Sequence, residues 1–352
     1  MAIYLHDKVA PRIEKIFKER SVVKSRFANR YSFDGVRTIK VMSLETSPLT
    51  DYVRSGANRY GTPSEVEDTY QSITLQMDKA FSKTIDKGNQ KDQGGLKAAG
   101  TFLSLQIQEQ YIPAYDKWVL NMLATRGGTI AGESTALTKS NVIGRISAAM
   151  TVLDDAEVPA EGRTIFVPAK VFDLIRMSDE FIKIEPMGMK GIKNGMVGDL
   201  FGASVVKVPK GRWPENVNYI IAHKDSAVCA EKIHDTKIHQ DPPGISGNLI
   251  EGRFYWGGDV LMAKANGIYV EVDTGSGKGT VLGTTTIAAS GGAFSGVSGA
   301  TYWYTTDGSD PRYSGTRKTG TAPDVTSSGT VVKAYATKAG AFDGPVSTQV
   351  LT

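Results

Sequence analysis

His234 and His239 are the candidate metal ligands of the sequence, because they stand close together in a polar run that ends at Asp241. A zinc site needs three or four ligands that converge on one point. Side chains five residues apart point to opposite faces of a strand, and they do not align on one face of a helix. The neighbouring Pro242-Pro243 indicates a loop. We therefore interpret the run as polar surface and predict no metal site.

Cys229 is the only cysteine and the candidate nucleophile, with His223 as the base that would activate it. It stands in the apolar run Ala227–Ala230, which favours a small core residue instead. A single cysteine excludes an intramolecular disulfide, a structural cysteine–zinc site and a redox dithiol.

The glycine-rich segment Thr274–Thr280 contains Gly277-Lys278 and partly matches a phosphate-binding loop. That motif requires a glycine five positions before Gly277 and a serine or threonine directly after the lysine. Val272 and Gly279 occupy these positions, so we predict no nucleotide site. The chain also contains no Gly-x-Ser-x-Gly, Gly-x-Gly-x-x-Gly or His-Glu-x-x-His motif. These observations predict a protein that is not an enzyme and uses no cofactor.

The chain has 352 residues, of which 40% are hydrophobic and 22% charged, as expected for one large folded domain and a smaller one. No apolar run approaches the roughly 18 residues of a membrane span. Residues 281–352 contain 14 Thr, 8 Ser and 11 Gly but no Glu. Short β-rich runs alternate there with turn residues, which predicts a small antiparallel sandwich joined to the rest by a flexible linker, 274–280.

The net charge of +4 is distributed unevenly. Residues 1–40 hold ten Lys and Arg against four Asp and Glu. The basic residues of this amino-terminal arm, 1–35, include Lys15, Lys18, Arg20, Lys24 and Arg26. Such an arm could bind nucleic acid or an acidic partner surface. A solvated helix face is the alternative interpretation.

Strand patterns at Val36–Leu44 and Ile73–Met77 flank a polar segment of some 25 residues. A loop of that length is uncommon inside a compact domain, so we predict a projecting hairpin that rests on a neighbouring molecule. A stripe of apolar residues at three- and four-residue spacing then predicts a long helix over 96–123. We expect a kink or a break at Pro113, which lacks the backbone N–H that a helix needs.

The remaining patterns alternate without a repeated unit. We predict helices over 138–155 and 169–178, and strands over 164–167, 195–208, 219–222, 227–230 and 268–272. The order predicts an α+β fold with long-range strand pairing.

Three segments in this order resemble the major capsid proteins of tailed bacteriophages, which have the Hong Kong 97-type fold. They are Arg163–Pro168, Phe172–Ile175 and Gly198–Pro209, and Ile112–Asp116 in the long helix is also similar to members of that family. The resemblance covers roughly residues 30–273. It implies an N-terminal arm at 1–35, an extended loop at 36–85 and a capsid body at 86–273.

Within that body the resemblance implies a spine helix at 96–123, a peripheral domain at 124–190 and 251–273, and an axial domain at 191–250. Copies would form hexamers and pentamers of an icosahedral shell around double-stranded DNA, with a portal and cement proteins as further partners. The shell would be assembled in the bacterial host cytoplasm and found in the virion. The arm is too short for the cleaved scaffolding segment of many relatives, so we expect a separate scaffolding protein.

Contacts between subunits are expected at the extended loop, where Arg54 and Arg59 would meet acidic residues of a neighbour. Glu65, Glu67 and Asp68 lie on the other side of the same loop. No lysine occurs between Lys40 and Lys79, so we do not expect the covalent cross-link that some relatives form through a loop lysine.

The tail carries a second resemblance. Tyr302–Pro311 resembles the immunoglobulin-like module at the carboxyl end of chitobiase-type hexosaminidases. Asp307 and Asp310 are interpreted as turn-forming residues, with calcium binding as the alternative. Such a domain would be displayed on the outer surface of a shell, where its aromatic residues could stack on a surface glycan: Trp303, Tyr304, Tyr313 and Tyr335.

Two other functions remain open from the sequence. A binding protein or an enzyme that the tail directs to polysaccharide would need a concave site with converging carboxylates in 36–273, which the sequence does not show. A cellular protein-storage compartment of the same fold is the other alternative.

Overall fold

A computed structural model describes residues 20–27, 31, 33, 36–44, 49, 51–56, 58–60, 65, 68–92, 99–178 and 198–352. The predicted contact residues Lys15, Lys18 and Glu67 lie outside the described residues, and Asp68 is described in its backbone only. The fold mixes helices and sheets, which confirms the α+β prediction. Within the described residues, no helix is both long and apolar enough to span a membrane.

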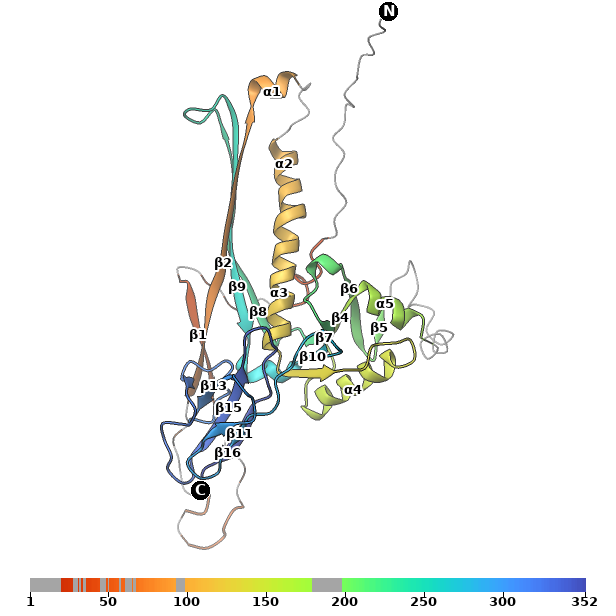
Figure 1. Cartoon of the computed structure of the whole chain (residues 1–352). Helices are drawn as coiled ribbons and strands as arrows, with labels where there is room; N and C mark the ends of the chain where they lie inside the picture. The colour runs from red at the N-terminus through yellow and green to blue at the C-terminus, as the bar shows by residue number, and fades with distance from the viewer. Residues whose placement is uncertain are drawn as a thin grey trace, which may run out of the picture.

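A long antiparallel sheet forms one side of the molecule. Its strands are β1 (Thr38–Leu44), β2 (Asp68–Asp86), β9 (Gly247–Val260) and β8 (Ala227–Gln240), in the order β1-β2-β9-β8. Figure 1 shows β2, β9 and β8 running beside the spine helix, with the short helix α1 (Lys87–Asp92) after the far end of β2.

The sequence predicted a loop around Pro242-Pro243, and that prediction is wrong for the residues that precede the two prolines. His234 and His239 belong to β8, because this segment pairs with β9 from Ala227↔Val260 to Gln240↔Asn248. One face of these strands is exposed to solvent and the other packs on a helix, so their sequence carries no continuous apolar run.

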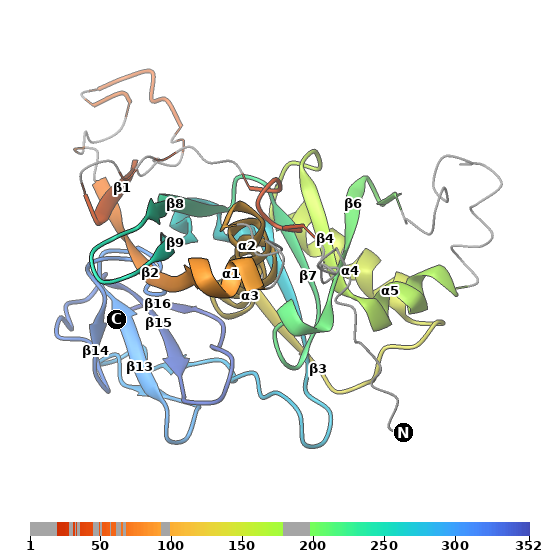
Figure 2. The ribbon, with the colours of Figure 1, turned by 90° about the horizontal axis from the view of Figure 1, so that it is seen from above.

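The spine helix comprises α2 (Ala99–Gln106), the π-helical η1 (Ile107–Tyr111) and α3 (Ile112–Arg126). The disturbance expected at Pro113 takes the form of this π-helical turn, which ends at Tyr111, two residues before the proline. A π turn accommodates a residue whose backbone cannot donate the regular helical hydrogen bond. Figure 2 shows the spine helix between the long sheet and a second sheet.

The second sheet has six strands in the order β3-β10-β7-β4-β6-β5. Its strands are β3 (Thr129–Glu133), β10 (Ile268–Asp273), β7 (Val217–His223), β4 (Arg163–Pro168), β6 (Ala203–Val208) and β5 (Asp199–Leu200). The 3-10 helix η3 (Lys210–Arg212) connects β6 to β7, and η4 (Met262–Gly267) connects β9 of the long sheet to β10.

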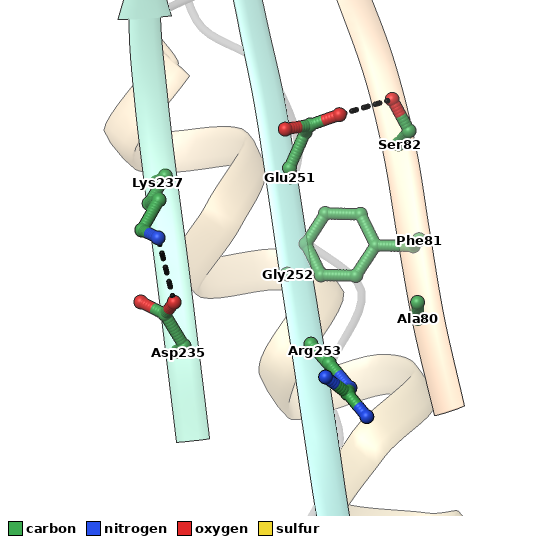
Figure 3. A pocket seen from close by; sticks show the side chains of 8 residues that line it. All are labelled: Ala80, Phe81, Ser82, Asp235, Lys237, Glu251, Gly252 and Arg253. Atoms are coloured by element: carbon green, nitrogen blue, oxygen red, sulfur yellow. Dashed lines mark hydrogen bonds and ion pairs between the residues drawn. The ribbon is translucent and has the colours of Figure 1, made fainter. Parts of the chain in front are cut away.

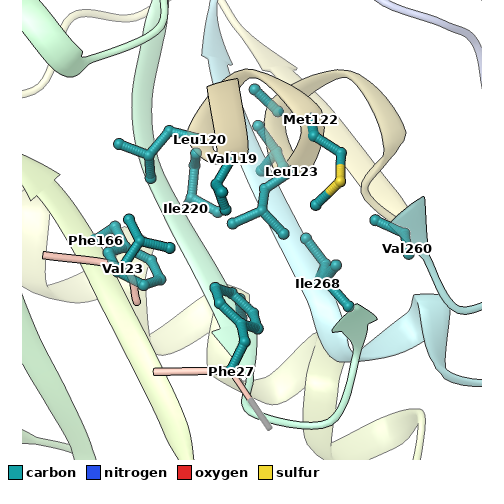
Figure 4. Close-up of a cluster of buried hydrophobic side chains, with 14 of the residues drawn as sticks. Val23, Phe27, Val119, Leu120, Met122, Leu123, Phe166, Ile220, Val260 and Ile268 are labelled. Carbon is teal, nitrogen blue, oxygen red and sulfur yellow. The ribbon is translucent and has the colours of Figure 1, made fainter. Parts of the chain in front are cut away.

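The central strands of this sheet are buried on both faces. Ile165 and Ile221 pack against α4 (Val142–Asp155) and α5 (Ala169–Arg176). The alternate residues, Phe166 and Ile220, join the core around α3. Figure 4 shows side chains of α3 pointing toward Ile220 and Ile268 of the sheet. Burial on both faces explains why β4, β7 and β10 are continuous apolar runs in the sequence.

Strand pairing does not follow the predicted division of the body at residue 190. The six-stranded sheet combines β3 and β4, from the predicted peripheral domain, with β6 and β7, from the predicted axial domain. Most of β8 and β9 instead extends the sheet of the predicted extended loop. The roles of peripheral and axial domain therefore stay predictions.

The tail domain, residues 281–352, is built from strands alone. A four-stranded antiparallel sheet has the order β14 (Lys318–Thr319), β13 (Thr301–Thr305), β15 (Val331–Thr337) and β16 (Ser347–Val350). A two-stranded sheet, β11 (Thr286–Ile287) and β12 (Phe294–Ser295), packs with it around Tyr304, Val332 and Leu351. The immunoglobulin-like assignment stays a prediction.

The linker 274–280 is a hydrogen-bonded turn, in contrast to the flexible hinge predicted from its glycines. Thr274 N donates to Glu133 O at 2.9 Å, and Gly279 N donates to Asp273 O at 3.1 Å. Lys278 forms an ion pair with Asp273 at 2.5 Å. The tail domain is thus attached through an ordered connection.

Two glycine substitutions test this packing. Gly257 of β9 pairs with Leu75 of β2, and a Cβ atom at Gly257 would lie 2.5 Å from Leu75 Cα. Gly257→Ala should therefore lower the free energy of unfolding by about 1–3 kcal/mol. Gly144 is exposed in α4 with open space around it, so Gly144→Ala should instead raise that energy by about 0.5–1 kcal/mol. Urea denaturation measures the free energy of unfolding of both variants. Equal changes in the two variants would contradict the close approach of β9 to β2 at Gly257.

Candidate assembly surfaces

The extended loop exposes large apolar side chains. Leu49 is 102% exposed and Tyr60 is 87% exposed, with Met42, Tyr52 and Val53 exposed as well. Tyr60 lies edge-on to Tyr52 with ring centroids 5.0 Å apart. Exposed apolar side chains gathered on one segment are typical of a surface that another molecule covers.

Of the charged residues predicted for subunit contact, Arg54, Arg59 and Glu65 are exposed on this loop. Arg59 Nε donates to Gly56 O at 3.2 Å, and Val53 N donates to Arg59 O at 3.0 Å, which closes the loop tip. Among the described residues, the structure forms no ion pair between these arginines and Glu65. Their contact with a neighbour stays a prediction.

A buried carboxylate on the spine helix binds the arm; we call this group the arm cluster. Asp116 is 0% exposed. Its Oδ1 accepts from Ser21 Oγ at 2.5 Å, and its Oδ2 accepts from Val22 N at 3.0 Å and from Arg212 Nη1 at 2.9 Å. Arg212 also donates to Arg20 O at 2.9 Å. A buried charge is stable only when it is paired and hydrogen-bonded, and the arm supplies two of the donors.

Glu231 of β8 extends the arm cluster. Its carboxylate contacts Lys24 Nζ at 2.5 Å, Tyr111 Oη at 2.7 Å and His234 Nδ1 at 2.6 Å. Burial alone would raise the pKa of Glu231, but hydrogen bonds from Lys24, Tyr111 and His234 hold that pKa below its usual value.

Apolar arm residues complete the attachment. Val23 and Phe27 are buried in the core, and the Phe27 ring stacks on Phe166 with centroids 6.3 Å apart. Arg26 Nη1 donates to Ser204 Oγ at 3.1 Å. Of the basic residues predicted to meet a partner, Lys24 and Arg26 thus bind groups of their own chain.

The tail domain meets the end of the spine helix through a second group, which we call the tail cluster. The ring of Tyr313 lies between the guanidinium groups of Arg126 and Arg312, at 5.4 and 5.3 Å from its centroid. Tyr313 Oη donates to Arg126 O at 2.5 Å. Arg126 also forms an ion pair with Asp259 of β9. Sequence reasoning missed this cluster, because 186 residues separate Arg126 from Arg312.

An acidic side chain at the edge of the tail cluster has an unusual affinity for protons. Burial raises the pKa of Asp343 to about 6, although Arg126, Arg312 and Arg317 act in the opposite direction. The carboxyl group of Asp343 therefore keeps its proton to a higher pH than an exposed aspartate would.

The turn-forming interpretation of Asp307 and Asp310 agrees with their contacts. Asp307 Oδ1 accepts from Ser309 N at 3.0 Å, and its Oδ2 accepts from Thr316 Oγ1 at 2.5 Å. Asp310 forms an ion pair with Arg312 at 2.8 Å. Across the described part of the chain, no three His, Cys, Asp or Glu side chains are grouped so that they could hold a metal ion.

The tail aromatics proposed for glycan stacking are largely covered. Tyr304, Tyr313 and Tyr335 are buried. Trp303 is half-buried, its Nε1 donates to Thr337 Oγ1 at 3.2 Å, and the Arg317 guanidinium covers its ring at 4.6 Å. A sugar would have to displace Arg317 in order to stack on Trp303.

Cys229 and His223 do not form a nucleophile and base. His223 Nε2 lies 2.9 Å from Glu161 O, and its Nδ1 accepts from Asp225 N at 3.2 Å. Burial raises the pKa of the Cys229 thiol to about 12, so the thiolate is scarce at neutral pH.

A shallow hollow of about 420 Å³ lies on the long sheet, over β2, β9 and β8 (Figure 3). Its charged side chains are paired: Asp235 with Lys237 at 3.0 Å, and Arg253 with Asp78 at 2.6 Å. Figure 3 shows the Phe81 ring over Gly252, between these charged groups. The hollow is thus lined by charges that are paired within the sheet, as on a polar protein surface.

Comparison with known proteins identifies solved structures that share the fold. No family model and no curated protein matches the chain. A chain of Mycobacterium phage Che8 has a TM-score of 0.63 at 18% identity, with 78% of this chain and 98% of that chain covered. The capsid structure of cyanophage P-SCSP1u gives 0.62 at 14% identity, covering 77% and 93%. The head structure of Helicobacter pylori bacteriophage KHP40 gives 0.58 at 10% identity, covering 76% and 96%.

The chain therefore has the fold found in phage capsid and head structures. Those chains are matched almost completely, whereas about a fifth of this chain remains outside the match. The tail domain, 281–352, also makes up about a fifth of the chain.

Removing the buried carboxylate should release the arm. Asp116→Ala leaves Arg212 without its carboxylate and Ser21 without its acceptor, so we expect a loss of about 3–5 kcal/mol in the free energy of unfolding. Limited proteolysis should then cut the arm faster. Asp78→Ala, which removes an exposed ion pair with Arg253, is the matched control and should change neither measurement appreciably.

Asp343→Asn tests the charge balance of the tail cluster. The pKa of Asp343 in the folded chain, about 6, lies above its ordinary value of 3.8, so stability is lost as pH rises through this window. Above it, the wild type buries a charge that the variant lacks. We expect Asp343→Asn to gain about 1–2 kcal/mol at pH 8 and nearly nothing at pH 4.

Urea denaturation at both pH values measures this gain. Asp324→Asn is the control, because its pKa is lowered by Lys318 and no gain at pH 8 is expected from it. A gain for Asp343→Asn that is equal at both pH values would contradict the electrostatic origin.

Proposed function

We propose that this chain is the major capsid protein of a tailed bacteriophage, with the Hong Kong 97-type fold, and that it self-assembles into the icosahedral head that encloses double-stranded DNA. The observation that carries the proposal is the match of residues across almost the whole length of phage capsid and head chains, at TM-scores of 0.58 to 0.63. The paired charges of the hollow and the high thiol pKa of Cys229 support a structural role over a catalytic one.

The extended loop supports self-association. It combines exposed apolar side chains at Leu49 and Tyr60 with the exposed cation of Arg54. Burying the apolar groups against a second copy would stabilise the contact, while the charges would select its orientation. Many such contacts, each weak alone, would hold hexamers and pentamers in a shell.

The other partners follow from the same proposal. A separate scaffolding protein would direct assembly in the host cytoplasm, and a portal and cement proteins would be further partners of the shell. Packaged DNA would lie inside, within reach of the basic arm. The tail domain would be an immunoglobulin-like module on the outer surface, and the cover of Arg317 on Trp303 makes glycan binding by that face the weaker alternative.

Charge reversal in the extended loop tests assembly. The double variant Arg54→Glu and Arg59→Glu places like charges against the acidic side of a neighbour, so particle yield should fall by about tenfold or more. Sedimentation and negative-stain microscopy of the chain expressed with its scaffolding protein measure that yield.

Lys338→Glu is the control, because its ammonium group donates to Ser298 O inside the tail domain. Normal particles from the double variant would contradict the proposed contact. The thermal midpoint of the unassembled subunit should be unchanged, which separates a loss of assembly from a loss of folding. A wild-type chain that stays monomeric with its scaffolding protein would overturn the capsid proposal itself.

A further inference from the structure

We infer that the tail domain is an intramolecular clamp, which joins the end of the spine helix to the base of the extended loop and holds the two at a fixed angle. This gives the domain a mechanical function in addition to any display on a surface. The inference concerns the single subunit and does not depend on the proposed capsid function.

The first contact of the clamp, made by Arg312 and Tyr313, caps the spine helix. Helix α3 ends at Arg126, and Gly127 follows with φ −61° and ψ 148°, so the usual left-handed cap is absent. The last carbonyl groups of a helix lack partners inside it. Here Arg126 O accepts from Tyr313 Oη at 2.5 Å, and Arg312 Nη1 donates to Gly127 O and Gly128 O at 3.2 and 2.7 Å.

The charge of Arg312 also suits this position. The carboxyl end of a helix carries partial negative charge, and a cation there is stabilising. The Arg312 side chain is only 12% exposed and keeps its orientation through the ion pair with Asp310. It therefore acts as a capping group that is fixed before it meets the helix.

The second contact of the clamp, made by Gly315, is with the base of the extended loop. Gly315 N donates to Tyr70 O at 3.3 Å, near the start of β2. A Cβ atom at Gly315 would lie 2.6 Å from the Tyr70 ring, so a larger residue would press on that ring. Tyr70 pairs with Met42 of β1, and Lys40 Nζ lies 4.5 Å from the centre of its ring. The contact therefore reaches β1 through Tyr70.

The two contacts of the clamp are joined by interactions within residues 1–273 as well as by the tail domain itself. Arg126 Nη2 donates to Arg312 O at 3.0 Å, and Arg126 also pairs with Asp259 of β9, the strand that lies next to β2. The hydrogen-bonded linker fixes the tail at a further point, Glu133 of β3. A domain held at several points on different elements cannot rotate freely, in contrast to one joined by a flexible chain. Figure 1 shows the tail beside the end of α3 and the base of β2.

Hydrogen exchange of the full-length subunit tests the clamp. Tyr313→Phe removes only the hydroxyl that caps Arg126, so amides of 120–128 should exchange at least about fivefold faster, because the helix end frays. Tyr302→Phe is the matched control, because its hydroxyl bonds to Val297 inside the tail. It should leave the exchange of 120–128 unchanged.

A second substitution tests the contact between Gly315 and Tyr70. Gly315→Val pushes against the Tyr70 ring, so amides of 68–75 should exchange faster by a similar factor. If this variant unfolds the tail, seen as lost protection of β13 and β15, then Tyr313→Phe and Arg312→Lys decide the question. Arg312→Lys keeps the charge but loses the forked donor, and it should also speed the exchange of 120–128.

The clamp is overturned if Tyr313→Phe and Arg312→Lys both leave the exchange of 120–128 within twofold of the wild type. It is also overturned if the effects stay inside 281–352. Either result leaves the capsid proposal untouched, because no particle is involved. Failure of the loop variants to affect assembly would likewise leave the clamp untouched.

Discussion

The burial of α3 between two sheets is the interaction on which the other attachments depend. Val119, Leu120 and Leu123 are completely buried in the core shared with the six-stranded sheet. On the side of the long sheet, the Tyr111 ring at the start of α3 stacks on Phe254 with centroids 4.2 Å apart. Each such side chain contributes about 1.5–3 kcal/mol by leaving water. Because the helix is fixed in this way, its carboxylate and its end can serve as attachment points for the arm and for the tail.

Local patterns predicted the elements that are buried uniformly. The apolar stripe predicted the spine helix, and the continuous apolar runs predicted β4, β7 and β10, because burial on one stripe or on both faces leaves a clear period. The strand β8 was missed beyond Ala230, since its inward-facing residues include His234, which packs edge-on against Phe254. Contact of a polar ring with an aromatic cluster leaves no apolar signal in the sequence.

The two clusters escaped prediction for a different reason. From the sequence, Asp116 was named only as part of a resemblance, and Arg126 was not singled out. Neither has a partner nearby in sequence: Asp116 binds Ser21, 95 residues away, and Arg126 binds Arg312. Single-sequence reasoning assigns a charge to solvent unless a local partner is visible. The long-range partners become visible only when strand pairing brings them together.

The glycines after the spine helix explain why its cap comes from a distant domain. A Cβ atom at Gly128 would lie 2.1 Å from Ala265 O, and one at Gly127 would lie 2.9 Å from the Val270 side chain. The close approach of the helix end to β10 and η4 therefore requires residues without side chains. Glycine commonly caps a helix in the left-handed conformation, but Gly127 is extended and forms no such cap. The tight packing at this end thus creates the unpartnered carbonyl groups that Arg312 and Tyr313 satisfy.

The contacts of the arm also limit which of its charges can act on a second molecule. The Lys24–Glu231 pair is half-exposed and contributes about 0–1 kcal/mol, whereas burial of Val23 and Phe27 contributes about 1.5–3 kcal/mol each. The apolar pair therefore supplies most of the attachment, and the polar contacts select its register. Lys24 and Arg26 are thus occupied within the chain, whereas the Arg20 side chain is exposed.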